Sequence, residues 1–296
     1  MADTTLATSA ALKKRHPLLS ALLGEQRVLW GGGVIALLFL IAVFAPLIAP
    51  HNPLEQDLML SRVPPVTWPG AEPGYYLGTD DLGRDVLSRL IYGTRTALTV
   101  AVIAAGLAAI LGSLLGLLAG WYGGWTDRVI SRLVDIWMAF PPVLLSVLLV
   151  AVLGAGLHSV IAAIVIIDWT RFCRVVRAET IAQGGMDYVT AARTVGFSRM
   201  QILVKEIVPN IMPVFVALLS LEMGIAVVVE AILSFVGLSV SSDSPTWGGM
   251  IAAGRQTIHH TPWVLVAPLC MLLVTVLSFN QLGNGLRRAL DPVMRR

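Results

Sequence analysis

Long apolar runs alternate with polar segments along most of the chain, and this alternation predicts a bundle of membrane-spanning helices. A helix needs about 20 mostly apolar residues to cross a bilayer. Six runs approach or exceed that length, at residues 30–49, 96–121, 130–157, 160–172, 211–236 and 262–282. The pattern therefore predicts an all-α fold, a polytopic membrane helix bundle with six transmembrane helices.

The polar segments between these runs define the expected organisation. We expect an N-terminal tail at 1–29, the first transmembrane helix at 30–50, a loop rich in Pro and Gly at 51–95, a five-helix core at 96–285 that contains a polar loop at 177–209, and a C-terminal tail at 286–296. A signal peptide would have an apolar core of only about 7–15 residues, followed by a small-x-small cleavage site. The first run is longer than that, so we expect it to be retained as a helix.

The composition excludes a soluble protein and gives no sign of nucleic-acid binding. Of the 296 residues, 56% are hydrophobic and only 13% are charged, against about 25% charged residues in a soluble domain. A nucleic-acid binder would gather Lys and Arg with aromatic residues on one face, whereas here the basic residues flank apolar runs. Cys173 and Cys270 have neither the number nor the spacing of a disulfide framework.

The distribution of basic residues predicts the orientation in the membrane. With six spans, both tails and the loops near residues 128 and 171–205 fall on one side, and they carry most of the 21 Lys and Arg residues. Cytoplasmic loops carry such an excess. Both termini are therefore expected in the cytoplasm, and the 51–95 loop on the outer side.

A polar insert at residues 187–210 interrupts the apolar pattern and predicts two helices around a turn. Asp187 is placed to cap a first helix, and Gly196 has the freedom at positive φ that a sharp turn needs. Ser198 followed by Gln201 is a capping-box pattern that begins a second helix. Pro209 is expected to end it.

Two interpretations of this insert are open, an amphipathic helix on the lipid headgroups or a docking site for another protein. A headgroup-bound helix has a strongly basic polar face. Here acidic and basic residues are mixed, and a glycine turn lies inside the insert. We therefore favour docking onto a cytoplasmic partner.

The insert resembles the EAA loop of ABC importer permeases, written E-A-A, three residues, G, nine residues, I-x-L-P. The residues at the motif's spacing are Ala191, Ala192, Gly196 and Pro209. The departures are Thr190 for the Glu, Glu206 for the Ile and Val208 for the Leu. The resemblance implies that the contact with the ATPase is made by Asp187, Thr190, Ala191, Ala192, Gly196 and Pro209.

Four further stretches resemble one branch of that family, the dipeptide/oligopeptide/nickel branch, and within it the C-type permease subunit. They lie at residues 77–95 (LGTDDLGRDVLSRLIYGTR), 230–238, 244–256 and 277–292. The resemblance implies a type I ABC importer permease fold in a bacterial inner membrane. It also implies a second permease subunit, two ATPase subunits and a periplasmic solute-binding protein as partners.

The chain itself has no standard site for ATP. A P-loop needs G-x-x-x-x-G-K-[ST], and the only lysines, at positions 13, 14 and 205, neither follow a Gly nor precede Ser or Thr. We therefore expect a transport subunit without catalytic residues and without a cofactor of its own. ATP and Mg²⁺ would be bound by the ATPase subunits.

Charged residues outside the insert supply the remaining candidate sites. The acidic group Asp80, Asp81 and Asp85 with Arg84 is expected to face outward, either to contact the binding protein or to stabilise its own loop. Carboxylates inside a membrane usually face a wet cavity or the bundle interior. Glu222 and Glu230 are therefore candidates for the translocation path, with interhelical hydrogen bonds as the alternative.

Three other patterns have simpler interpretations. Asp168 and Arg171 are three residues apart, which suits a local helix ion pair near the cytoplasmic end of the fourth run. Gly112, Gly116 and Gly120 form a small-residue row that we attribute to packing within the chain. His259 and His260 are adjacent and cannot share a helix face, so no metal site is expected.

The predicted function is the permease subunit of an ATP-driven importer for dipeptides, oligopeptides or related small solutes. Nickel chelates and glutathione-type solutes are alternative cargoes within the same branch. A more remote alternative is an ion-coupled secondary transporter. Such proteins often contain inverted repeats, and no repeat is visible in this sequence.

Overall fold

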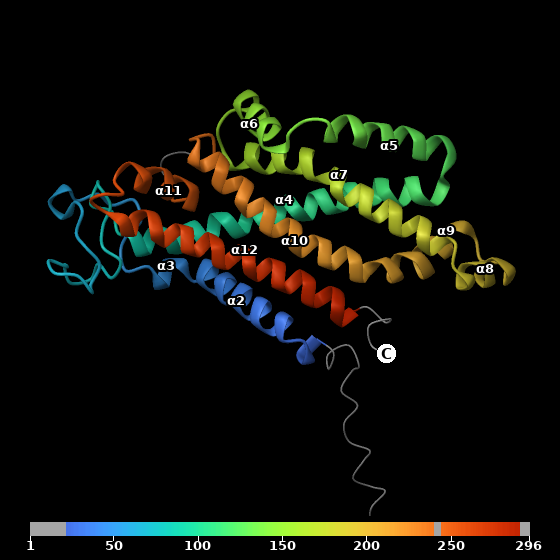
Figure 1. Ribbon diagram of the computed structural model, residues 1–296, viewed down its shortest axis with the longest axis horizontal. Coiled ribbons are helices and arrows are strands. Elements are labelled where there is room, and N and C mark those ends of the chain that lie inside the picture. Colours follow the sequence, from blue (N-terminus) through green and yellow to red (C-terminus); the bar gives the residue numbers. More distant parts are fainter. Residues whose placement is uncertain (1–21, 240–243, 291–296) are drawn as a thin grey trace, which may run out of the picture.

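The computed structural model describes residues 22–239 and 244–290, and within these ranges the fold is a bundle of long helices without strands (Figure 1). The helices are α2 (Gln26–Val43), α3 (Ala45–Ile48), the 3-10 turn η1 (Leu58–Leu60), α4 (Val86–Tyr122), α5 (Gly124–Met138), α6 (Pro142–Leu153), α7 (Leu157–Gly184), α8 (Asp187–Thr194), α9 (Arg199–Ile202), the π turn η2 (Leu203–Ile207), α10 (Val208–Phe235), α11 (Trp247–Gln256) and α12 (Pro262–Leu290). Most of the predicted N-terminal tail and the last six residues of the predicted C-terminal tail lie outside the described residues.

Four helical runs are long and apolar enough to cross a membrane, where the sequence predicts six spans. They are Gln26–Val43, Val86–Tyr122, Arg199–Phe235 and Pro262–Leu290. The helices α5 and α6 together would make a fifth span, bent by 87°. The fold is therefore an all-helical membrane bundle with four to five apolar spans by length and composition.

The third predicted run, at 130–157, is not one straight helix. It is divided between α5 and α6, with Pro141 at the N-cap and Pro142 at the first position of α6. Proline has no backbone N–H to donate, and it disfavours the helical conformation of the preceding residue. Two adjacent prolines therefore end α5 and allow α6 to begin in a new direction.

The fourth predicted run, at 160–172, is only part of a longer helix. α7 continues to Gly184, through residues that the sequence pattern assigned to a polar loop. Asp168 consequently lies near the middle of α7 rather than near its end. Hydropathy ended the run early because α7 carries several charged residues beyond Thr170.

α4 and α7 lie side by side along most of their length (Figure 1). The glycine row of α4 faces the backbone of α7, and a Cβ atom built at Gly116 would lie 2.6 Å from the carbonyl oxygen of Cys173. A Cβ at Gly120 would lie 2.7 Å from Cβ of Thr180. The prediction that this row serves packing within the chain is confirmed.

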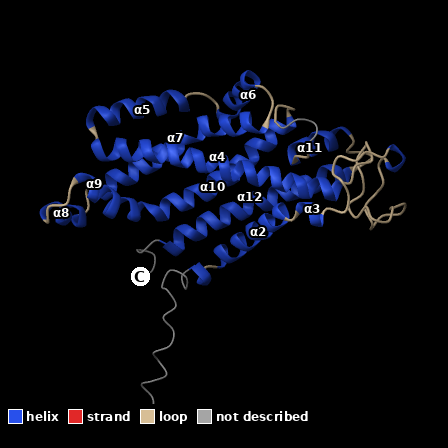
Figure 2. Ribbon diagram, turned by 180° about the vertical axis from the view of Figure 1, so that it is seen from behind, coloured by secondary structure: helices blue, strands red, loops and turns tan. Residues whose placement is uncertain are grey.

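The second layer consists of α10, α12 and α2, with α12 between the other two (Figures 1 and 2). α11 lies in a segment for which the sequence predicts only a loop. Its first residue, Trp247, is fully buried and donates from its indole N–H to the carbonyl oxygen of Leu90, at 3.2 Å.

The two polar regions lie at opposite ends of the bundle. The loop that joins α3 to α4 is gathered at one end, and α8 and α9 project from the other, as both views show (Figures 1 and 2). A membrane around the long helices would therefore separate these two regions.

Candidate functional site

The polar insert is folded as two short helices around a glycine turn, as predicted. Gly196 has a φ of +94° between α8 and α9. At the start of α9, the backbone N–H of Gln201 donates to Oγ of Ser198 at 3.3 Å, and the N–H of Ser198 donates to Oε1 of Gln201 at 2.9 Å. We call residues 187–202 the helical hairpin.

Two details of the hairpin differ from the sequence prediction. Asp187 is the first residue of α8 and does not cap it, because Met186 occupies the cap position. Its carboxylate still lies in the first turn, where the helix dipole favours negative charge. Pro209 does not end the second helix, since it is the second residue of α10. A proline is tolerated in the first turn of a helix, and the π turn η2 directly before it joins α9 to α10.

Apolar and cation–π contacts hold the hairpin against the end of α4. Val189 is fully buried in a cluster with Ile202 and Ile207, against which Trp121 packs. The guanidinium of Arg193 lies 5.6 Å from the centre of the Trp121 ring, a distance at which a cation is attracted to an aromatic face. The hairpin is thus packed directly against the end of α4.

The outer surface of the hairpin combines small and large apolar side chains. Asp187, Thr190 and Ala191 are exposed and Ala192 is half-buried. Large exposed apolar side chains lie in the same segment of the chain, namely Met186, Val195, Phe197, Met200 and Val204. Ile202 and Leu203 of the same segment are buried instead. Several large apolar side chains exposed within one short segment are typical of an interaction site.

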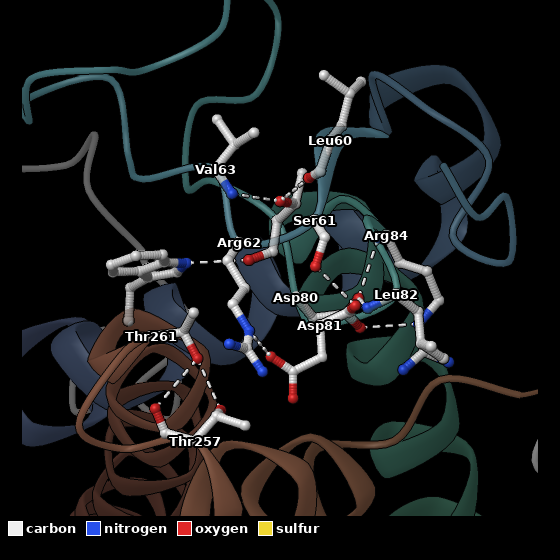
Figure 3. Close-up of polar contacts among 12 residues, drawn as sticks. Leu60, Ser61, Arg62, Val63, Asp80, Asp81, Leu82, Arg84, Thr257 and Thr261 are labelled. Carbon is white, nitrogen blue, oxygen red and sulfur yellow. Dashed lines mark hydrogen bonds and ion pairs between the residues drawn. The ribbon is translucent and has the colours of Figure 1, made fainter. Parts of the chain in front are cut away.

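The acidic group of the outer loop divides into buried and exposed members, and Figure 3 shows the contacts of Asp80, Asp81 and Arg84. Asp80 is 4% exposed, and its Oδ2 lies 2.7 Å from Nε of Arg84 and 3.7 Å from Nε of Arg89. Asp85 is also buried and caps α4 by accepting from the N–H of Ser88 at 2.8 Å. These two carboxylates therefore stabilise the loop.

Asp81 is the member of the group that reaches the surface. Its Oδ1 accepts from Nε of Arg62 at 2.8 Å, and both side chains remain well exposed (Figure 3). Arg84 is largely buried beside Asp80. A protein that binds this end of the molecule would meet Asp81 and Arg62 first.

A polar cluster lies inside the bundle between α7 and α10. Nη1 of Arg171 donates to Oε2 of Glu222 at 3.1 Å and to Oε1 at 3.4 Å. Nε of Arg171 lies 4.0 Å from Oδ1 of Asp168, so the predicted ion pair of these two residues exists at its outer limit. The closer partner of Arg171, Glu222, could not be predicted from local spacing, because that contact joins residues 51 positions apart.

Glu230, the second candidate for the path, has a different environment. It is 1% exposed, and its Oε1 accepts from Oγ of Ser234 at 2.5 Å and from Oγ of Ser239 at 3.3 Å. These hydroxyl donors come from the end of α10 and the segment just after it. The contacts favour the alternative interpretation of Glu230 as a residue that holds the structure together.

Two further ion pairs attach α5 to α7. Arg177 pairs with Asp127 through two hydrogen bonds, one of them 2.7 Å from Nη2 to Oδ2. Arg174 pairs with Asp135 at 3.3 Å, with both side chains more than half exposed. Together with Glu222, these acids provide a partner for each arginine in the second half of α7.

Within the described ranges, no group of three or more His, Cys, Asp or Glu residues is arranged to hold a metal ion. His259 and His260 are both exposed after α11.

Two family models match the chain. Residues 112–296 match the binding-protein-dependent transport system inner membrane component, and residues 26–65 match the N-terminal TM domain of oligopeptide transport permease C. The first match covers more than half of the chain and includes the hairpin.

Curated relatives align over nearly the whole length. The dipeptide transport system permease protein DppC of Escherichia coli K12 is 42% identical, over 89% of this chain and 87% of its own. The di/tripeptide transport system permease protein DppC of Pseudomonas aeruginosa is 38% identical, over 89% and 88%. The glutathione transport system permease protein GsiD of Shigella dysenteriae is also 38% identical, over 88% and 84%.

A solved structure shares the arrangement of helices. A chain of the MetNI methionine ABC transporter in an inward-facing conformation aligns with a TM-score of 0.58 and 21% identity, over 69% of this chain and 97% of its own. At this identity the likeness shows the fold alone.

Proposed function

Since the chain belongs to the family of binding-protein-dependent transport system inner membrane components, we propose that it is the permease subunit of an ABC importer whose cargo is dipeptides or oligopeptides. The observation that carries the proposal is the helical hairpin, which presents an apolar docking surface at the end of the bundle opposite the outer loop. Relatives that align over nearly the whole chain are dipeptide and oligopeptide permeases.

We propose six membrane crossings, with the α5–α6 pair as the third and α7 as the fourth. α7 has 28 residues, enough for about 42 Å of helix at 1.5 Å per residue. Its charges explain why hydropathy misses it. Charged side chains are tolerated in a membrane protein when they are paired and face the interior. Arg171 and Arg177 each have an acidic partner, and only a third of each side chain is exposed. A type I importer permease fold is consistent with this arrangement.

The proposed assembly contains a second permease, two ATPase subunits and a periplasmic binding protein. ATP and Mg²⁺ would be held by the ATPases, one of which would dock on the hairpin through Asp187, Thr190, Ala191 and Ala192. Both termini of this chain would lie in the cytoplasm of a bacterium with the bundle in the inner membrane, and Asp81 with Arg62 would face the loaded binding protein.

The connection between the hairpin and the membrane suggests how motion is transmitted. α9, η2 and α10 form one helical run, Arg199–Phe235, so the second helix of the hairpin continues directly into a span. Movement of the docked ATPase would tilt α10, which carries Glu222 at its middle. The bundle would then alternate between inward-facing and outward-facing states, with no chemistry in this chain.

A glutathione-type cargo is the second candidate, and it is supported by the 38% identity to a glutathione permease. Both cargoes are tested by uptake into liposomes that contain the complete importer. We expect peptide uptake to require ATP, the ATPase subunits and the binding protein. Uptake should persist when ionophores collapse all ion gradients. Uptake that stops with the gradient and ignores ATP would contradict the proposal.

A further inference from the structure

Asp168 is a buried carboxylate that lacks a hydrogen-bond donor among the described residues. Its side chain is 5% exposed, and its one charged partner, Nε of Arg171, is 4.0 Å away. A buried carboxylate without a donor is costly, and more so within a membrane bundle. Such a group is expected to meet a donor from outside the chain.

Arg171 is shared between Asp168 and Glu222, and its closer contact is with Glu222. Its Nη1 is engaged with both carboxylate oxygens of Glu222. The three side chains therefore hold two carboxylates and one guanidinium, which leaves a local excess of negative charge at Asp168. Glu230, by contrast, receives two hydroxyl donors from its own chain.

Asp168 and Arg171 line a cavity of about 230 Å³ between α6, α7 and α10. The rest of the wall is apolar and includes Pro142, Val143, Ile164, Ile167, Ile225 and Val228. The volume is below the roughly 300 Å³ at which pockets for drug-sized ligands begin. It suits one amino-acid residue with an apolar side chain, held beside a carboxylate.

We propose that Asp168 binds the ammonium group of the cargo in a subsite of the translocation path, and that the apolar wall takes the side chain of the amino-terminal residue. The inference rests on the proposed function and adds the chemistry that the path recognises. The excess carboxylate selects a cationic group over an anionic one. Arg171 is a positioning residue here, since its bond to Glu222 holds its guanidinium closer to Glu222 than to Asp168.

The first test compares Asp168→Asn with Asp135→Asn in the complete importer in liposomes. Asp135 is the matched control, because it also pairs with an arginine of α7 but lies on the surface. We expect Asp168→Asn to lower uptake of a dipeptide with a free amino terminus about tenfold. This is the effect of losing one hydrogen bond to a charged group. ATP hydrolysis stimulated by the loaded binding protein should remain, and Asp135→Asn should change neither.

The outcomes of this test separate the inference from the proposed function. If the unaltered importer moves no peptide, the proposed function fails. If it moves peptide and Asp168→Asn moves it equally well, the inference is wrong and the proposed function stands. Loss of both uptake and ATP hydrolysis in Asp168→Asn would indicate a structural role and would also contradict the inference.

A second measurement keeps Asp168 in place. Val228→Cys puts a thiol on the cavity wall of the complete importer, and its reaction rate is measured with a cationic aminoethyl and an anionic sulfonatoethyl thiosulfonate. The same chain without the new cysteine gives the background from Cys173 and Cys270. We expect faster reaction with the cationic reagent and slowing by free dipeptide. Equal rates, a faster anionic reaction or no reaction would overturn the inference.

Discussion

The guanidinium of Arg171 on α7 donates to both carboxylate oxygens of Glu222 on α10, at 3.1 and 3.4 Å. This contact joins the helix that packs on the glycine row of α4 to the helix that continues from the hairpin. Any movement of α10 relative to α7 must therefore stretch or break it.

Removing the cation of this pair should destabilise the bundle. Arg171→Met leaves Glu222 and Asp168 buried without it, and breaking a buried pair from one side costs about 3–5 kcal/mol. We expect the lower part of that range, because a third of the Arg171 side chain is exposed. Thermal unfolding of the purified protein measures the loss.

The double variant Arg171→Met/Glu222→Met removes both charges and should recover part of this stability. The control is Arg174→Met, whose exposed pair with Asp135 should cost no more than about 1 kcal/mol. Equal losses in Arg171→Met and Arg174→Met would show that the buried pair does not stabilise the bundle.

The glycine row should tolerate no added methyl group where it meets α7. In Gly116→Ala the new Cβ would lie 2.6 Å from the carbonyl oxygen of Cys173. Overpacking of this kind costs about 1–3 kcal/mol. Gly106→Ala, on the same helix, has no atom within 4 Å of its new Cβ, so its stability should be unchanged or higher. A similar unfolding temperature for both variants would argue against close packing of α4 on α7.

The turn of the hairpin should depend on the conformation of Gly196. A Cβ at this position would meet no atom within 4 Å, so the cost of Gly196→Ala comes only from its φ of +94°, about 1–2 kcal/mol. We expect weaker binding of the ATPase subunits and less peptide moved per ATP. Gly185→Ala, with φ of −90° at the other end of α8, is the control and should retain normal coupling.

Substitutions in the outer acidic group should distinguish Asp80, which stabilises the loop, from Asp81, which is expected to contact the binding protein. Asp80→Asn weakens the contacts with Arg84 and Arg89 in a buried position, so it should lower the unfolding temperature. Asp81→Asn loses only an exposed pair with Arg62, so the unfolding temperature should not change. Half-maximal uptake should then require a higher concentration of loaded binding protein. A change of stability in Asp81→Asn alone would reverse this assignment.

The sequence predicted the parts of the fold that depend on local pattern. Apolar runs gave the long helices, and the Ser198–Gln201 spacing gave the start of α9, because both signals are contained within a few turns of helix. The length of α7 was missed for the same reason. The second half of α7 carries charged residues, and hydropathy scores it as polar because it does not take into account their ion-pair partners on α5 and α10.

Among the candidate residues, the sequence could identify unusual charges but not their partners. Asp80 and Asp81 are adjacent in the chain, yet one is buried and the other exposed. Glu222 and Glu230 lie on the same helix, yet one pairs with an arginine and the other with two serines. The Arg171–Glu222 pair joins residues 51 positions apart, which local spacing does not contain. Arg84 and Ser234 are only four positions from Asp80 and Glu230, but spacing alone does not show which of these side chains the fold buries.

The central claim is that the helical hairpin is the docking site of an ATPase subunit, and cross-linking from Ala191 tests it most directly. Ala191 is exposed on α8, and Leu58, 70% exposed in the outer loop, is the control. In intact membranes with the complete importer, we expect Ala191→Cys to capture an ATP-hydrolysing subunit and Leu58→Cys to capture none. Failure of Ala191→Cys to capture an ATPase, or capture of one by Leu58→Cys, would contradict the account.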